Sequence, residues 1–282
     1  MPIGTLYLVA TPIGNLSDLS PRAKETLAAA DFLAAEDTRV THKLLSALGL
    51  PNKPMISYYE HNRRQRGEEI LAKILAGETC ALVTDAGTPA VSDPGEDLVA
   101  LCAENGVTVL SIPGCCAAVN ALAVSGLPTG RWCFEGFLSM NKKARREHLD
   151  SLRGEKRTMI FYEAPHKLRP TLDDLCAYFG GDRRIALCRE LTKLHEETLR
   201  MTLAEAVAYY AENAPRGEFV LIVDGASEAP IPEDADDRMA RALEAVHNRI
   251  EAGETLKDAV KMVSADMGVK KNALYKLALG EA

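Results

Sequence analysis

TLYLVATPIGN (residues 5–15) is the first apolar run of the chain, followed by the loop that ends it. The apolar half is typical of a short buried strand, and the proline and glycine of the second half end strands. The same order of apolar run, small-residue loop and helix recurs down the chain. This alternation predicts an α/β fold with a mostly parallel sheet in the first half.

Eight apolar segments are predicted to be strands, namely residues 5–10, 32–35, 80–84, 107–112, 132–137, 158–162, 185–189 and 218–223. Helices are expected from Ser20-Pro21 onward and over 38–48, 64–76, 96–104, 143–152, 168–179 and 203–212, because N-cap and breaker residues bound them. The second half has more antiparallel potential than the first. We expect two α/β domains, 1–114 and 115–226, an acidic linker at 227–237, and an all-helical domain at 238–282 that resembles a helix-turn-helix.

The composition limits the possible functions. Net charge is −7 over 282 residues, which argues against a general nucleic-acid coat but leaves room for an RNA enzyme with local positive charge. The seven cysteines lack zinc-site spacing, so we expect reduced thiols and no metal. No signal peptide and no apolar run of ~20 residues is present, which predicts a cytoplasmic protein without a membrane segment.

Loops at predicted strand ends are the candidate ligand-binding segments, because ligands of α/β sheets bind beyond the carboxyl ends of the strands. The first half supplies 11–15, DAGTPAVSDPG (85–95) and SIPGCCAA (111–118), and the second half supplies FYEAPHK (161–167) and RELTK (189–193). The 85–95 loop has no lysine or arginine, so it suits the amino-acid end of a cofactor better than a phosphate. None of these loops is G-x-G-x-x-G, which disfavours a nicotinamide oxidoreductase.

These loops, together with EDTR (36–39) and YYEHN (58–62), resemble the tetrapyrrole methylase superfamily in order and spacing. Within it they are similar to the ribose 2′-O-methyltransferases that act on a decoding-site cytidine of 16S ribosomal RNA. The resemblance covers about residues 4–225 and extends to the added C-terminal helices. It implies the two-domain fold of class III S-adenosylmethionine-dependent methyltransferases, a small helical domain and a homodimer.

The resemblance also implies which residues contact S-adenosylmethionine. They come from both halves of the chain and are Ile13, Ala86, Gly87, Thr88, Val91, Cys116, Ala117, Tyr162, Glu163 and Leu191. Porphyrin-directed relatives have a glycine-rich first loop and Gly-Asp-Pro in the second, whereas this chain has Pro12 and Thr88 there. A tetrapyrrole substrate is therefore the alternative, and RNA is the expected one.

Methylation of a ribose hydroxyl is helped by a base that removes its proton. Candidates are Glu36, Asp37, Glu60, His61, Glu190 and Lys193, and the first choice is the pair Asp37 and Lys193. The alternative for each of these side chains is a surface salt bridge. Assignment of the base therefore depends on the structure.

Binding to 16S ribosomal RNA, or to the small ribosomal subunit, requires cations that contact phosphate. The expected contacts are Arg39 and Arg189 near the cleft and the basic clusters at 61–66 and 141–146, which contribute Arg63, Arg64, Lys142, Lys143, Arg145 and Arg146. The alternative for each cluster is a solvated helix face. For the C-terminal helices, RNA docking, a packing appendage and a dimer contact all stay open, and a DNA-binding regulator is a less favoured alternative because the protein is acidic.

Overall fold

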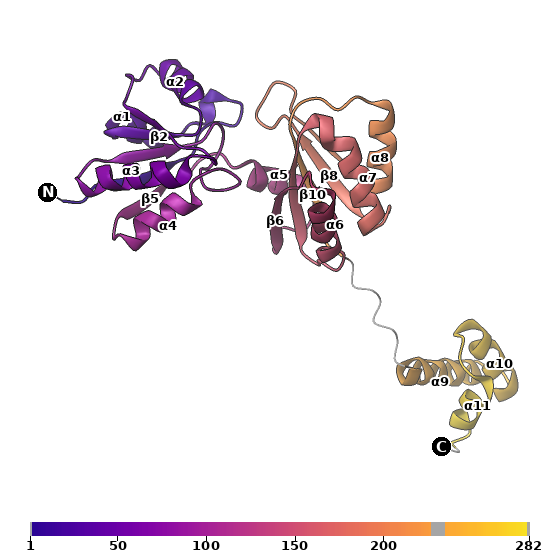
Figure 1. Cartoon of the computed structure of the whole chain (residues 1–282). Helices are drawn as coiled ribbons and strands as arrows, with labels where there is room; N and C mark the ends of the chain where they lie inside the picture. The colour runs from indigo at the N-terminus through magenta and orange to yellow at the C-terminus, as the bar shows by residue number, and fades with distance from the viewer. Residues whose placement is uncertain (1, 227–234, 281–282) are drawn as a thin grey trace. The chain divides into compact units, whose positions relative to one another are not determined.

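The computed structural model describes residues 2–226 and 235–280. The chain divides into two compact units, Met1–Ala226 and Ser227–Ala282. Two five-stranded sheets form the first unit, and the described residues of the second form three helices (Figure 1). Most of the expected acidic linker, residues 227–234, lies outside the described residues. In the described ranges no helix combines the length and apolarity that membrane crossing requires.

The first sheet is entirely parallel, as the alternation of strands and helices predicted. Its strands, in spatial order, are β3 Met55–Ser57, β2 Phe32–Ala35, β4 Cys80–Val83, β1 Thr5–Val9 and β5 Thr108–Ile112. Because the strands are parallel, their carboxyl ends and the loops that follow lie along one edge of the sheet. The expected ligand-binding loops of the first half are therefore neighbours.

Helices cover both faces of this sheet, which explains why β2 and β4 are apolar at every position. α1 Pro21–Ala29 and α2 Thr38–Ala47 bury Leu27 and Leu45 on one face, and α3 Arg63–Leu75 and α4 Glu96–Glu104 bury Ile70 and Leu98 on the other. The start of α1 is as predicted, because the Ser20 side chain accepts from the Ala23 amide at 3.1 Å. We call β1 to β5 and these helices the first lobe.

The second sheet is mixed, and it forms the centre of the second lobe. Its order is β6 Trp132–Phe137, β7 Thr158–Glu163, β10 Phe219–Val223, β8 Arg184–Arg189 and β9 Glu197–Thr202. Only β6 and β7 pair in parallel in this sheet, so the antiparallel tendency of the second half is confirmed. α5 Ala117–Ser125 covers one face, while the other is covered by α6 Lys142–Ser151, α7 Leu168–Phe179 and α8 Leu203–Glu212.

All eight predicted strands are present, and the predicted α/β fold class is confirmed. Two strands were not predicted, β3 and β9, and each lies at one edge of its sheet. In the second unit, α9 Ala235–Glu251, α10 Leu256–Asp266 and α11 Lys271–Ala278 share a core of their own that includes Val246, Val260 and Leu274. Short 3-10 helices are present at Leu16–Asp18 and Pro165–Lys167.

Candidate functional site

Backbone hydrogen bonds tie the first two candidate loops together. The Thr11 amide donates to the Gly87 carbonyl at 2.9 Å, and the Gly87 amide donates back at 3.1 Å. The Thr11 hydroxyl also donates to the Thr84 carbonyl at 3.2 Å. Since Gly87 has φ +89°, a conformation that glycine adopts without strain, this bridge accounts for the glycine in DAGTP.

The second loop is in turn fixed to the third, because the Thr88 hydroxyl donates to the Cys115 carbonyl at 2.9 Å. Ala90 and Ser92 in the second loop both have φ +65°, which is unusual for residues with a side chain. Two more such residues, Glu190 at +52° and Thr192 at +66°, lie in the loop after β8. Left-handed backbone of this kind concentrates at functional sites.

The Tyr162 side chain, near the end of β7, caps the N-terminus of α5. The N-cap residue of α5 is Cys116, whose side chain makes no capping hydrogen bond. The Tyr162 hydroxyl oxygen accepts instead from the Ala118 amide at 3.1 Å. The Tyr162 ring is held edge-to-face by Phe134 and Phe137, with centroid distances of 5.1 and 5.5 Å. Burial raises the pKa of Tyr162 to about 12, so the phenol stays protonated.

The two lobes meet at the first loop. A β-carbon built on Gly14 would stand 2.5 Å from Lys193 Cγ and 2.8 Å from Thr192 Oγ1. Ile13 packs against the apolar cluster between α5 and the second sheet. On the opposite side of the contact, Ser92 Oγ lies 3.5 Å from a β-carbon built on Gly136, at the bulge of β6. These contacts bring the strand-end loops of both sheets to one place.

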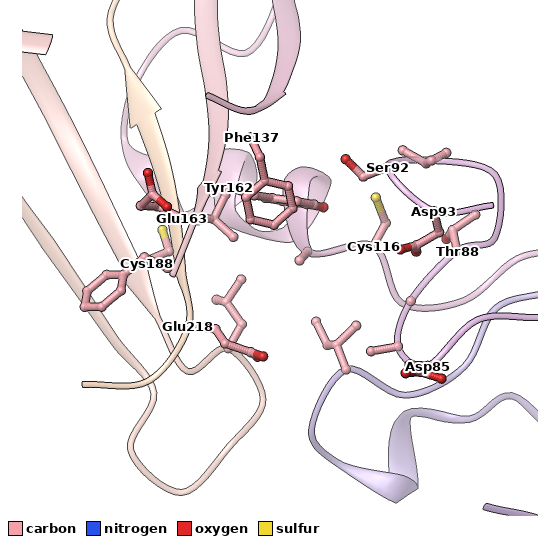
Figure 2. Close-up of a pocket in the computed structure, with 18 of the residues that line it drawn as sticks. Asp85, Thr88, Ser92, Asp93, Cys116, Phe137, Tyr162, Glu163, Cys188 and Glu218 are labelled. Atoms are coloured by element: carbon pink, nitrogen blue, oxygen red, sulfur yellow. The ribbon is translucent and has the colours of Figure 1, made fainter. Parts of the chain in front are cut away.

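A cleft of about 350 Å³ lies between the loops of the two lobes (Figure 2). All ten residues expected to contact the cofactor line this cleft, and their roles as contacts stay predictions. Figure 2 shows Thr88 and Asp93 from the first lobe, with Cys116 at the start of α5 beside them, facing Tyr162 and Phe137 from the second lobe. The remaining lining residues are Glu36, Asp85, Ser92, Ala164, Cys188, Glu190, Lys193, Glu218, Phe219 and Val220.

The cleft is acidic. Six carboxylate side chains line it, namely Glu36, Asp85, Asp93, Glu163, Glu190 and Glu218. Among the described residues, Lys193 is the one lysine that lines the cleft, and no arginine lines it. Burial is the main cause that raises the pKa of Glu36, Asp85 and Asp93, and the pKa of Asp93 rises to about 6. Such a cleft favours a ligand with positive charge and disfavours a phosphate.

The two expected catalytic residues lie in different surroundings and do not pair with each other. Lys193 lines the cleft, and its ammonium group donates to Glu190 at 2.9 Å and to Glu218 at 2.8 Å. Burial lowers the pKa of Lys193, but these two carboxylates outweigh burial and leave the pKa above its ordinary value. A protonated lysine cannot serve as a base.

Asp37 is absent from the described lining of the cleft. It caps α2 by accepting from the Arg39 amide at 2.8 Å, and its carboxylate binds the Arg39 guanidinium at 2.6 Å. Hydrogen bonds from Arg39 lower the pKa of Asp37 to about 2. The alternative of a surface salt bridge is thus what the structure shows. The Asp37 amide still donates to Asp85 in the cleft, at 3.2 Å.

The basic residues expected to bind RNA also differ in their surroundings. Five of them form ion pairs with acidic side chains of this chain, namely Arg39, Arg63, Lys143, Arg145 and Arg189. Arg145 is the most enclosed, with a side chain 16% exposed that binds both Asp174 and Thr171. Arg64, Lys142 and Arg146 are exposed, and no ion pair holds them within the described parts of the chain.

Ser92, Asp93, Phe137 and Glu218 are among the lining residues that sequence reasoning missed. Ser92 and Asp93 lie in a loop that was correctly assigned to the site, but the direction of each side chain depends on the left-handed turns at Ala90 and Ser92. Phe137 is 57% exposed at the end of β6. A large exposed aromatic residue at a strand end is the signal that could have identified it.

The strand-end loops of two α/β lobes line one acidic cleft, which is a common ligand-binding arrangement in α/β enzymes. The chain belongs to the tetrapyrrole methylase family, because the model described as Tetrapyrrole (Corrin/Porphyrin) Methylases matches residues 5–207. Two similar proteins are both named ribosomal RNA small subunit methyltransferase I. The one from Synechocystis sp. is 47% identical over 98% of each chain. The one from Escherichia coli O157:H7 is 45% identical over 98% of this chain and 95% of its own.

Solved structures share the fold at low identity. The uroporphyrin-III C-methyl transferase from Thermus thermophilus, complexed with S-adenyl homocysteine, is 18% identical with a TM-score of 0.53, over 78% of this chain and 97% of its own. The methyltransferase CobJ is 20% identical with a TM-score of 0.58, over 79% of this chain and 95% of its own. The second unit lies outside the family match.

Proposed function

We propose that this protein transfers the methyl group of S-adenosylmethionine to the 2′-hydroxyl of a ribose in small-subunit ribosomal RNA. The observation that carries the proposal is the acidic cleft of the tetrapyrrole methylase fold, in a chain whose relatives over nearly its whole length are named ribosomal RNA methyltransferases. Those named for uroporphyrin share only the fold at this identity. RNA is therefore favoured over a tetrapyrrole substrate.

The cleft suits S-adenosylmethionine in charge and in shape. A sulfonium and an α-ammonium are both positive, and among the described residues six carboxylates line the cleft against one lysine. Ile13, Val91, Phe137 and Leu191 supply apolar walls for a flat adenine ring. Gly87 and Ala117 also line the cleft and put no large side chain into it. These residues would hold the cofactor, which supplies an electrophilic methyl group on sulfur.

Within this site, we assign Lys193 a structural role. Its ammonium group holds the Glu190 and Glu218 side chains in place at one edge of the cleft through two ion pairs. Asp37 acts as a positioning residue, because it caps α2 and its amide fixes the Asp85 carboxylate. Neither residue is suited to remove a proton. Lys193 is held in its charged form, and the Asp37 carboxylate is already bound to Arg39.

RNA would be held by exposed cations that form no ion pair within residues 2–226 and 235–280, with Arg64, Lys142 and Arg146 as the first candidates. A target nucleotide in a cleft must leave its stack, so a single-stranded or flipped-out ribose is the form that would reach it. The decoding-site cytidine is the proposed target. Because small-subunit ribosomal RNA is found in the cytoplasm, we place the protein there.

We also propose a homodimer. α5 exposes Val119 and Val124, and the edge strand β5 exposes Leu110, each more than 40% accessible. Such exposed apolar side chains, on two elements that are consecutive in the chain, suit a second copy of the chain. Light scattering coupled to size exclusion should give twice the chain mass for the natural protein and a lower mass for Val119→Lys. A monomer for the natural protein would refute this part of the proposal.

The proposed activity can be tested by incubating the protein with methyl-labelled S-adenosylmethionine and either small ribosomal subunits, free small-subunit RNA or uroporphyrinogen. Nuclease digestion and mass mapping should find one methylated ribose in the RNA. The comparison of subunit and free RNA identifies which of the two is the substrate. Methylation of a base, or of the porphyrinogen alone, would overturn the proposal.

A further inference from the structure

The second unit is an addition to the fold that forms the cleft (Figure 1). The family model ends at residue 207, and none of the described residues that line the cleft lies beyond Val220. The relatives named for ribosomal RNA match 98% of this chain, so their similarity extends into the second unit. Its helices α9, α10 and α11 pack around a core of their own, so this unit is built for a task other than lining the cleft.

Charge in the second unit is divided between its helices. Residues 239–254, which include most of α9, contain three glutamates and two arginines, and Arg249 pairs with Glu254 at 3.0 Å. Residues 255–280, which include α10 and α11, contain five lysines, two aspartates and no other charged residue. We call residues 255–280 the lysine segment. Its charge is +3, in a chain whose net charge is −7.

The two aspartates of the lysine segment are engaged within the second unit. Asp258 accepts from the Thr255 hydroxyl at 2.7 Å at the start of α10. Glu254 and, to a smaller extent, Asp266 raise the pKa of Arg249, which places Asp266 close to that guanidinium. The lysines are exposed and form no ion pair within residues 2–226 and 235–280, and they are Lys257, Lys261, Lys270, Lys271 and Lys276. Their charge is therefore available to an external anion.

The lysines at the start of α11 do not serve the stability of that helix. The N-terminus is the positive end of a helix dipole, so carboxylates stabilise it and cations destabilise it. α10 follows this rule, with Thr255 as its capping residue and Asp258 in its first turn. α11 has Lys270 as an N-cap residue without a capping hydrogen bond, Lys271 as its first residue, and no acidic residue in its first turn. Two cations at a helix end that disfavours them indicate a role outside the helix.

The residue types of the lysine segment indicate which anion it fits. Lysine binds phosphate as a point charge, whereas arginine, which the segment lacks, supplies the paired donors that read guanine edges. Tyr275 is the one aromatic residue of the segment and is only partly exposed, so unpaired bases find no open ring on which to stack. The cleft itself is acidic and disfavours phosphate, so a polyanionic substrate must be held elsewhere on the chain. These features fit the phosphate backbone of RNA.

We propose that the lysine segment binds phosphates of the small-subunit ribosomal RNA and supplies affinity without reading its sequence. The inference rests on the proposed function, which makes this RNA the substrate. α10 and α11 are joined by residues 267–270, where Gly268 has φ +64°, and a short turn of this kind between two helices is found in helix-turn-helix motifs. Because both units belong to one chain, RNA held by the lysine segment reaches a higher local concentration for the first unit.

The test compares the full-length natural protein with the double variant Lys270→Gln/Lys271→Gln and with Lys270→Arg/Lys271→Arg, which keeps the charge. Filter binding of free small-subunit RNA over a salt series measures affinity. The glutamine variant should bind about tenfold more weakly at low salt, and its plot of log affinity against log salt should be less steep by about two, because two phosphate contacts are lost. The arginine variant should keep the natural affinity and slope.

Stability and kinetics separate an RNA contact from a structural role. The unfolding midpoint of the glutamine variant should equal the natural one or exceed it, because two cations leave the positive end of α11. In ribose methylation the loss should appear in KM for RNA and not in kcat, since the lysines hold the substrate and do not contact the reacting atoms. Lys257→Gln/Lys261→Gln on α10 removes the same charge from another helix and should weaken RNA binding in the same way.

Three results would overturn the inference. Natural RNA affinity and salt slope in both glutamine variants would show that the lysine segment does not contact RNA. Tighter binding of a DNA duplex than of an RNA duplex of the same length by the natural protein would favour a DNA contact. A lower mass of the glutamine variants in light scattering would assign the segment to contact between copies of the chain. The proposed function fails separately, since RNA that is bound through these lysines but not methylated would overturn the activity and leave the RNA contact standing.

Discussion

Gly14 in the first lobe and Lys193 in the second approach so closely that a β-carbon on Gly14 would stand 2.5 Å from Lys193 Cγ. Such a distance is well inside van der Waals contact, so the side chains of Lys193 and Thr192, or one of the two loops, must shift if Gly14 gains a side chain. The backbone of Gly14 is not left-handed, unlike many other glycines of this chain. Its role is therefore to let the two lobes touch, which shapes the cleft between them.

We accordingly expect Gly14→Ala to weaken S-adenosylmethionine binding by about tenfold, or about 1.4 kcal/mol, because the cleft walls separate. Calorimetric titration with the cofactor measures this effect. The matched control is Gly130→Ala, since a β-carbon there meets nothing within 4 Å. Equal affinities for both variants would show that the contact at Gly14 does not shape the cleft.

The hydrogen bond between Ala118 and Tyr162 leads to a second prediction. Tyr162→Phe removes the acceptor that caps α5 and leaves the Ala118 amide unpaired, at a cost of about 1 kcal/mol in unfolding free energy. Because Cys116 and Ala117 at this helix start line the cleft, cofactor affinity should fall as well. Denaturant unfolding and calorimetry measure the two losses.

A second substitution can test the cause of this loss. Cys116 has the extended backbone of an N-cap residue, at φ −142° and ψ 108°, but makes no capping hydrogen bond. Cys116→Ser should supply a capping oxygen and restore much of the stability lost in Tyr162→Phe. No restoration in the double variant would indicate that packing of the Tyr162 ring, and not its hydroxyl, explains the loss.

Buried strands were predicted from the sequence more reliably than the short or polar strands at the sheet edges. Buried strands such as β4 and β10 are continuous apolar runs, and the loops after strands had to share an edge once the first sheet was parallel. The edge strand β3 is only three half-buried residues after Pro54, and β9 carries Glu197 and Arg200 among its six residues. Neither has the apolar pattern on which strand prediction depends.

Side-chain direction within the site was less predictable. Asp37 directly precedes a helix, which is an N-cap signal. Its side chain accepts a hydrogen bond at the start of α2 and therefore does not line the cleft. The position of Asp93 depends on two left-handed residues and on the packing of Gly95, which no local pattern encodes. Lys193 binds Glu190 in the loop after β8 and Glu218 directly before β10. These partners are brought together by strand pairing in the second sheet.

The raised pKa of Asp93 predicts how stability depends on pH. A carboxyl group whose pKa rises on folding destabilises the folded state when it is charged, so this penalty is present above about pH 6 and disappears as the pH falls below the unfolded value. Asp93→Asn should therefore raise the melting temperature at pH 8 by roughly 2–4 °C, about 1 kcal/mol after solvent screening of a half-exposed group.

The same comparison at pH 4 should show little difference, because the natural side chain is then largely protonated in the folded protein. Scanning calorimetry at the two pH values measures both differences. A melting temperature lowered at pH 8 would instead show that the Asp93 charge is stabilised by its surroundings.

Arg145 was expected to bind RNA, but its contacts indicate a structural role. It joins α6 to α7 through Asp174 at 2.6 Å and donates to Thr171 at 2.9 Å, and Thr171 in turn donates to Glu163 in the cleft. Arg145→Ala should lower the unfolding free energy by about 2 kcal/mol, since it leaves a charged partner and a hydroxyl acceptor unpaired. Denaturant unfolding measures this; an unchanged midpoint would contradict it.

Arg146 is the next residue on the same helix, is exposed, and has no ion pair within residues 2–226 and 235–280, so it separates binding from stability. Arg146→Ala should leave the unfolding midpoint unchanged and weaken RNA binding about fivefold, or about 1 kcal/mol, at low salt. The plot of log affinity against log salt should also become less steep by about one, because one phosphate contact fewer releases one counterion fewer. Filter binding over a salt series, with the exposed Glu104→Gln variant as control, distinguishes this loss from a general change in charge. An unchanged slope would mean that α6 faces solvent and that the RNA path runs elsewhere on the protein.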